Sequence, residues 1–195
     1  MTENKSEKLG WINNQWGIFK DLKLPINNRG LNFADGIFET ILILNGTPQL
    51  LYKHLNRWEK SANILGMNPP PSKAWLISLI ENGIKRSKLN NTNGIIRLNW
   101  TRGSSKQRGI DISNTSLHNF WLEIDSYQPN FESISTMISQ TERRNSFSRL
   151  SYCKTFSYNQ GIQARIEAKN AGFNDALLLN NQGEICCSTT ANIIV

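Results

Sequence analysis

The sequence predicts an α+β fold made of two lobes. Strand-like and helix-like segments are grouped along the chain rather than strictly alternating, which is typical of α+β proteins. A polar, proline-containing segment, Gln128-Pro129-Asn130, separates the two groups. The length of 195 residues, 38% of them hydrophobic, suffices for one sizeable domain or two small ones. We therefore expect a small N-terminal α+β lobe over 1–127, a linker over 128–130, and a larger β-rich lobe over 131–195.

The first lobe is predicted to begin with strands and to continue with two helices. Asn45-Gly46 lies between two β-rich runs and is the strongest short hairpin signal. Leu55, Trp58 and Ala62 recur at helical spacing, and Ser72 can cap a second helix. The expected elements are two short strands within 11–28, a hairpin over 37–52, helices over 53–66 and 72–88, and strands over 94–101 and 119–127.

The second lobe is expected to be a strand, a helix and a hairpin. The adjacent Cys186 and Cys187 should point to opposite faces of a regular strand, which favours packing over redox chemistry. Only about 65 residues follow the linker, so this lobe is expected to be incomplete. Its expected elements are a strand over 133–140, a helix over 157–171, a hairpin of 175–180 and 184–188, and a final apolar strand over 191–195.

Composition excludes several classes of function. The net charge is +7, but no run of five basic residues and no zinc-finger or RNP-type motif is present, which argues against nucleic-acid binding. No stretch reaches the ~18 apolar residues of a membrane helix, and the polar start lacks a signal-peptide core, so no membrane partner is predicted. Three cysteines and two histidines without ligand spacing predict no metal site and a reduced, cytoplasmic setting.

A few residues can carry chemistry on their own chemical character. Lys154 lies among aromatic residues, where a desolvated ammonium becomes a better nucleophile; a solvated surface lysine is the alternative. Arg57, early in a predicted helix, can bind a phosphate through its fork or can simply face solvent. The basic loop over 101–109, with Arg102 and Arg108, can bind carboxylates or can be an ordinary hairpin tip.

These residues belong to a longer set of motifs that occur in a known order. The chain resembles the class IV aminotransferases, the fold-type IV pyridoxal-phosphate enzymes, over nearly its whole length. The motifs are Arg29-Gly-Leu-Asn-Phe-Ala-Asp-Gly-Ile-Phe-Glu-Thr40, His54-Leu-Asn-Arg57, Thr101-Arg-Gly, Lys154-Thr-Phe-Ser-Tyr158, Asp175-Ala-Leu-Leu-Leu-Asn180 and Gly183-Glu-Ile-Cys-Cys-Ser-Thr-Thr-Ala-Asn192.

The resemblance implies a role for each site residue. Lys154 corresponds to the lysine that binds pyridoxal 5'-phosphate covalently and moves protons, and Arg57 to the arginine on the cofactor phosphate. Tyr158 and Thr190 fall at positions beside the cofactor ring. Phe38, Arg102 and Arg108 match positions near the substrate, partly across a homodimer interface.

Two departures from the family pattern stand out. Members carry a glutamate that pairs with the pyridine nitrogen of the cofactor; here Cys187 occupies that position. Glu184 lies three residues earlier, which in a regular strand is the opposite face. Members also continue for roughly a third more sequence, which supplies part of the phosphate cradle.

Within the family, the Thr101-Arg-Gly…Arg108-Gly pattern is most similar to that of 4-amino-4-deoxychorismate lyase. The implied function is conversion of this small anionic amino substrate to 4-aminobenzoate and pyruvate for folate biosynthesis. The first alternative is an amino acid transaminase of the same fold, of branched-chain or D-amino acid type. The second is a truncated, non-catalytic remnant.

Overall fold

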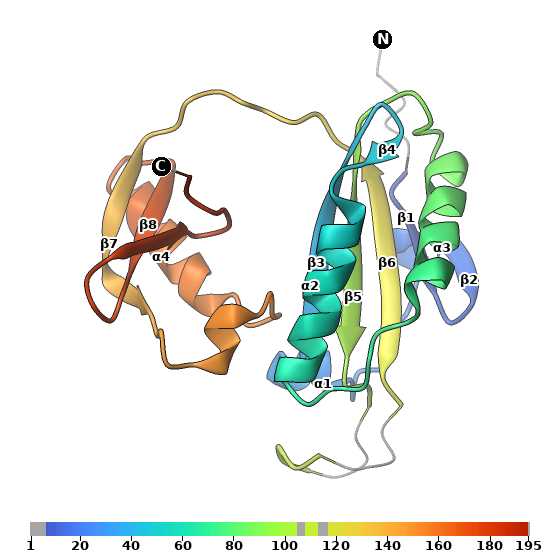
Figure 1. Cartoon of the computed structure of the whole chain (residues 1–195), viewed down its shortest axis with the longest axis horizontal. Helices are drawn as coiled ribbons and strands as arrows, with labels where there is room; N and C mark the ends of the chain where they lie inside the picture. Colours follow the sequence, from blue (N-terminus) through green and yellow to red (C-terminus); the bar gives the residue numbers. More distant parts are fainter. Residues whose placement is uncertain (1–6, 105–107, 113–116, 195) are drawn as a thin grey trace. The chain divides into compact units, whose positions relative to one another are not determined.

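The computed structural model describes residues 7–104, 108–112 and 117–194. The chain forms two compact units, coloured along the sequence in Figure 1. The first contains the residues up to Pro129 together with Cys153–Phe156, and the second contains Asn130–Tyr152 and the residues from Ser157 onward. No helix in the described part of the chain is long and apolar enough to cross a membrane.

The first unit is built on a six-stranded antiparallel sheet with the strand order β2-β1-β6-β5-β3-β4. The predicted hairpin is confirmed: Asn45 and Gly46 both have positive φ, and a Cβ on Gly46 would lie 1.9 Å from the carbonyl oxygen of Asn90. The strands are β1 (Leu9–Ile12), β2 (Gln15–Ile18), β3 (Gly36–Leu44), β4 (Thr47–Pro48), β5 (Gly94–Thr101) and β6 (Asn119–Ser126).

Two predicted helices of this unit are confirmed, α2 (Leu51–Ile64) and α3 (Lys73–Arg86). The side chain of Ser72 caps α3 as expected, accepting a hydrogen bond from the amide of Trp75. Two short helices, η1 (Phe19–Asp21) and α1 (Arg29–Phe33), were not expected from the pattern. They are too short to show an apolar period, and α1 is fixed by its cap at Asn28.

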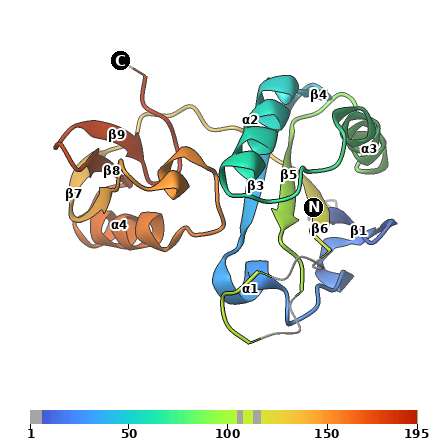
Figure 2. The same ribbon diagram turned by 60° about the horizontal axis from the view of Figure 1, so that its bottom comes forward.

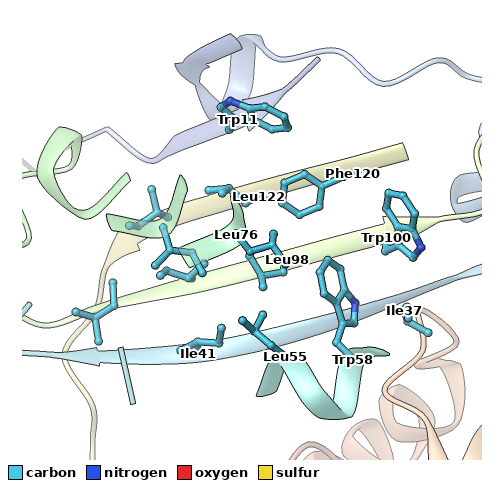
Figure 3. Packing of buried hydrophobic residues seen from close by; sticks show 14 of the residues in the cluster. Trp11, Ile37, Ile41, Leu55, Trp58, Leu76, Leu98, Trp100, Phe120 and Leu122 are labelled. Atoms are coloured by element: carbon cyan, nitrogen blue, oxygen red, sulfur yellow. The ribbon is translucent and has the colours of Figure 1, made fainter. Parts of the chain in front are cut away.

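The main core lies between the sheet and helices α2 and α3, which cover one face of it (Figure 2). Strand register places Ile41, Leu98 and Leu122 on this covered face. Figure 3 shows them with Leu55 and Trp58 of α2, which are almost fully buried. Because side chains alternate along a strand, the neighbouring residues of β3, β5 and β6 point to the opposite face.

The second unit is a three-stranded sheet, β7-β8-β9, with one helix packed on it. Strands β7 and β8 are parallel, and α4 lies between them in sequence. Small residues of α4, Ala164 and Ala168, pack against Ala176 and Leu178 of β8. The elements are β7 (Thr136–Arg144), η2 (Arg149–Tyr152), α4 (Asn159–Asn170), β8 (Asp175–Asn180) and β9 (Ile185–Ser188).

Two expectations for the second lobe are wrong. Residues 191–194 are not a strand, because the chain turns back at Ser188, whose amide donates to the carbonyl of Ala191 and whose hydroxyl accepts from the amide of Ala191; position 195 lies outside the described residues. The segment Cys153–Phe156 belongs to the first unit, because its backbone pairs with β3.

Candidate active site

Lys154 is placed by backbone pairing at the edge of β3. The amide of Phe38 donates to the carbonyl of Lys154 (2.9 Å), and the amide of Phe156 donates to the carbonyl of Gly36 (3.0 Å). Gly36 permits a close backbone approach, since a Cβ there would lie 3.0 Å from the carbonyl oxygen of Trp100 and 3.1 Å from the Phe156 ring. The half-buried Lys154 brings its Nζ to 4.5 Å from the centroid of the Phe38 ring.

A second cation shares the Phe38 ring with Lys154. The Cζ of Arg97 lies 3.6 Å from the ring centroid, well within the range of a cation–π contact. The Nε of Arg97 donates to the Oδ1 of Asn99 (2.9 Å) and lies 3.6 Å from a carboxylate oxygen of Glu123. The face of the sheet opposite α2 and α3 thus carries an amine and a guanidinium beside one aromatic ring.

Asn99 is a residue that sequence analysis missed. Its side chain is 1% exposed, and the bond from Arg97 fixes which amide atom is the oxygen. The Nδ2 has no hydrogen-bond partner among the described residues, which leaves a buried donor. The alternation in 94–101 could have placed Arg97 and Asn99 on one face, but their proximity to Phe38 depends on strand register.

Arg57 is held on the covered face of the sheet by a buried carboxylate. Its Nε and one terminal nitrogen donate to the two oxygens of Glu39 at 2.7 and 2.5 Å, and the Nδ1 of His54 lies 2.8 Å from the same carboxylate. Glu39 is fully buried, whereas the Arg57 side chain is 44% exposed. Two consecutive residues of β3 therefore position the two predicted cofactor residues. Phe38 binds the backbone of Lys154, and the carboxylate of Glu39 binds the guanidinium of Arg57.

The charge of Glu39 depends on these contacts. Burial alone would raise the pKa of this carboxyl, but the hydrogen bonds from Arg57 and His54 outweigh it and hold the pKa below its ordinary value. Glu39 thus stays ionised and keeps the Arg57 fork in one orientation.

Replacing Arg57 by glutamine is expected to lower the free energy of unfolding by about 1 kcal/mol at neutral pH. This is less than the ~1.5–3 kcal/mol of a charged hydrogen bond, because the guanidinium is partly exposed. The lowered pKa of Glu39 stabilises the fold fully above the unfolded pKa of about 4.3, and this is lost as the pH falls through the folded value. The variant should therefore lose less stability than the wild type between about pH 7 and pH 3.

Urea unfolding at both pH values measures this difference. Lys60→Gln removes an exposed cation from the same helix and serves as the control. Equal losses on acidification in all three proteins would contradict the role of Arg57.

Arg102, expected near the substrate, is buried, and its guanidinium binds groups of the protein itself. It is 5% exposed, and its Nε donates to both oxygens of Asp35 at 3.1 and 3.0 Å. Its terminal nitrogens donate to the carbonyls of Leu65 and Gly66. Asp35 also accepts from the Nε of the buried Arg29 (2.7 Å), so one carboxylate joins two guanidinium groups.

Arg108 is exposed to solvent, and the residues that follow it in the loop contact α1. The terminal nitrogens of Arg29 donate to the carbonyls of Ile110 and Asp111, which ties the loop to α1. Residues 105–107 of the predicted basic loop lie outside the described residues. Of the two substrate arginines expected in this loop, only Arg108 has a side chain exposed to solvent.

The other predicted site residues lie in the second unit. Tyr158 is half-buried at the start of α4, where its carbonyl accepts from the amide of Ile162. Thr190 is exposed, and its hydroxyl accepts a bond from Arg165 (3.3 Å). Cys187 is partly buried on β9. The carboxylate of Glu184 accepts from the side-chain amide of Asn180 at the hairpin end, so it is already engaged.

These residues fit a phosphorylated aldehyde cofactor by the chemistry of their donor groups. Lys154 offers a primary amine, Arg57 a guanidinium suited to phosphate, and Tyr158 and Thr190 offer hydroxyl groups. Cys187 is a weak hydrogen-bond partner where the resemblance implies a carboxylate. Within the described residues, no group of three or more metal-ligating side chains is present.

Comparisons with known proteins agree on one family. A family model described as amino-transferase class IV matches residues 36–195. A Methanocaldococcus jannaschii protein that carries the name of a branched-chain-amino-acid aminotransferase is 27% identical over 95% of this chain. A Listeria monocytogenes D-alanine aminotransferase is 30% identical over 50% of the chain. The branched-chain amino acid aminotransferase of Escherichia coli has the same fold, with a TM-score of 0.84 and 17% identity over 95% of this chain.

The chain is shorter than these relatives. It spans 64% of the length of the Methanocaldococcus protein, 33% of the Listeria protein and 63% of the Escherichia coli structure.

Proposed function

The chain belongs to the class IV aminotransferase family, and from this premise we propose that the full-length protein is a pyridoxal 5'-phosphate-dependent aminotransferase acting on a small anionic amino acid. The observation that carries the proposal is the position of Lys154, whose amine is held beside the Phe38 ring next to the guanidinium of Arg97. The branched-chain and D-alanine aminotransferases among its relatives support this reaction class.

The proposal gives each residue of the first unit a task. The cofactor, when bound, supplies an electron sink for the substrate carbon. Lys154 provides the amine that attaches the cofactor and then carries a proton at its Nζ. Arg57, oriented by Glu39, binds the phosphate.

The substrate side of the proposal rests on the face of the sheet opposite α2 and α3. Arg97 offers a guanidinium, and Asn99 offers an amide donor that has no hydrogen-bond partner within the described part of the chain; both groups are suited to a carboxylate. Arg108, exposed on its loop, can add a second cation. We further propose a homodimer and cofactor contacts from Tyr158, Cys187 and Thr190, as the resemblance implies.

Cleavage of 4-amino-4-deoxychorismate remains a second candidate function. Cys187 favours it, because a thiol supports the pyridine nitrogen less well than a carboxylate and an aromatising lyase has another driving force. The Thr101-Arg-Gly pattern adds little support to this candidate, since Arg102 binds Asp35 and backbone carbonyls.

Product analysis on the full-length protein with added cofactor distinguishes the candidates. We expect glutamate to form from an amino donor only when 2-oxoglutarate is present. Release of pyruvate from 4-amino-4-deoxychorismate without a keto-acid acceptor would instead establish the lyase. A protein that shows no absorbance change with pyridoxal 5'-phosphate would be a non-catalytic remnant.

A further inference from the structure

The two adjacent thiols of β9 lie on the same side of the strand, contrary to the alternation expected from the sequence. The Sγ atoms of Cys186 and Cys187 are 3.9 Å apart. The cause is a β-bulge: Cys187 pairs with Leu178 and Ile185 pairs with Leu179, so Cys186 is the extra residue. The same bulge breaks the regular alternation of side chains between Glu184 and Cys187, so these two residues are not required to lie on opposite faces.

The pair is accessible and reduced. Cys186 is exposed and Cys187 is partly exposed, and both are free thiols. The Sγ of Cys186 donates to the carbonyl of Leu178 at 3.2 Å, which fixes its direction. Burial of the sulfur and the neighbouring Cys187 raise the pKa of the Cys186 thiol to about 11. The thiol is therefore protonated near neutral pH, and a bound centre has to displace its proton.

Backbone geometry disfavours a disulfide between these two residues. Cα atoms joined by a trans peptide are about 3.8 Å apart, whereas disulfides usually join Cα atoms at about 4.4–6.8 Å. If a single atom bridges the two sulfurs, the sulfurs need not approach to bonding distance, and the short Cα separation is no longer an obstacle. Two sulfurs bound at about 2.3 Å to one tetrahedral centre are roughly 3.8 Å apart, close to the separation found here.

We propose that Cys186 and Cys187 form a two-thiol site for one thiophilic metal or metalloid centre, with its remaining positions filled by groups from outside the protein. Two soft sulfur donors select such centres. A trivalent organoarsenical is the simplest occupant, because it requires only two sulfurs. In that reaction the two S–H bonds and the arsenic–oxygen bonds break, two As–S bonds form, and the oxygen leaves as one water. No oxidant or reductant is consumed.

Intact-mass spectrometry of the 195-residue chain with phenylarsine oxide tests the site. One equivalent should add one phenylarsenic group per chain. Cys186→Ser and Cys187→Ser should each reduce labelling at least ~10-fold, while Cys153→Ser, which removes the thiol outside β9, should label like the wild type. A 2,3-dimercaptopropanol wash should remove the group, and an equal concentration of glutathione should not.

The folded geometry is tested separately with the same chain unfolded in urea. If the bulge preorganises the sulfurs, the folded chain should be half-labelled at about tenfold lower probe concentration. Labelling that survives both serine variants, that depends on Cys153, or that is equally strong in urea would overturn the proposal.

Discussion

Replacing Lys154 by alanine is expected to abolish covalent attachment of pyridoxal 5'-phosphate and to lower turnover of the full-length protein by ~10³-fold or more. In the proposed function this amine attaches the cofactor, and proton transfer by a positioned side chain alone contributes about 10²–10⁴-fold. Its place beside Phe38 and Arg97 depends on the backbone pairing of 153–156 with β3, which alanine leaves intact. The variant should therefore fold normally and fail only in chemistry.

Borohydride reduction followed by peptide mapping measures the attachment directly. In the wild type the pyridoxyl group should be found on Lys154, and in Lys154→Ala no lysine should be labelled. Lys169→Ala, an exposed lysine of α4, is the matched control and should retain both labelling and activity. A label on another lysine of the wild type, with Lys154 unmodified, would refute the assignment.

Replacing Asp35 by asparagine is expected to lower the free energy of unfolding of the first unit by about 3 kcal/mol. The carboxylate lies between Arg29 and Arg102, whose side chains are only 5% and 7% exposed. Removing one partner of a buried ion pair costs about 3–5 kcal/mol, because a buried charge is left without compensation. Asparagine keeps the shape of the aspartate side chain and one of its oxygens as an acceptor. The expected loss in the free energy of unfolding is therefore at the lower end of this range.

Tryptophan fluorescence during urea unfolding measures this loss in the first unit, because all six tryptophans of the chain lie between Trp11 and Trp121. Asp21→Asn, at an exposed aspartate of the same unit, is the control and should change stability by less than about 0.5 kcal/mol. A change below about 1 kcal/mol in Asp35→Asn would mean that Asp35 does not hold the two arginines together.

Local sequence determined the elements whose signals are short-range. The Asn45-Gly46 turn was predictable because its two positive φ values favour these residue types. Helices α2 and α3 were predictable because apolar residues repeat at helical spacing over 14 residues in each. The motif around Lys154 indicated the family, which the family comparison confirmed.

The roles of individual side chains depended on contacts between distant parts of the chain. Arg102 has the same loop setting as Arg108 in the sequence, but only the fold brings Asp35 and the end of α2 to its guanidinium. Arg97 and Lys154 share the Phe38 ring because of strand register, which no single segment specifies.

The bulge in β9 is a second case in which the sequence alone does not determine where side chains point. From the sequence, Cys186 and Cys187 are neighbours in a strand and should face opposite ways. One unpaired residue opposite β8 is enough to bring their sulfurs to 3.9 Å. The sequence therefore determined where the longer helices, the Asn45-Gly46 turn and the candidate lysine lie, because these depend on neighbouring residues. Tertiary pairing decided which side chains meet, because register and bulges depend on the partner strand as much as on the strand itself.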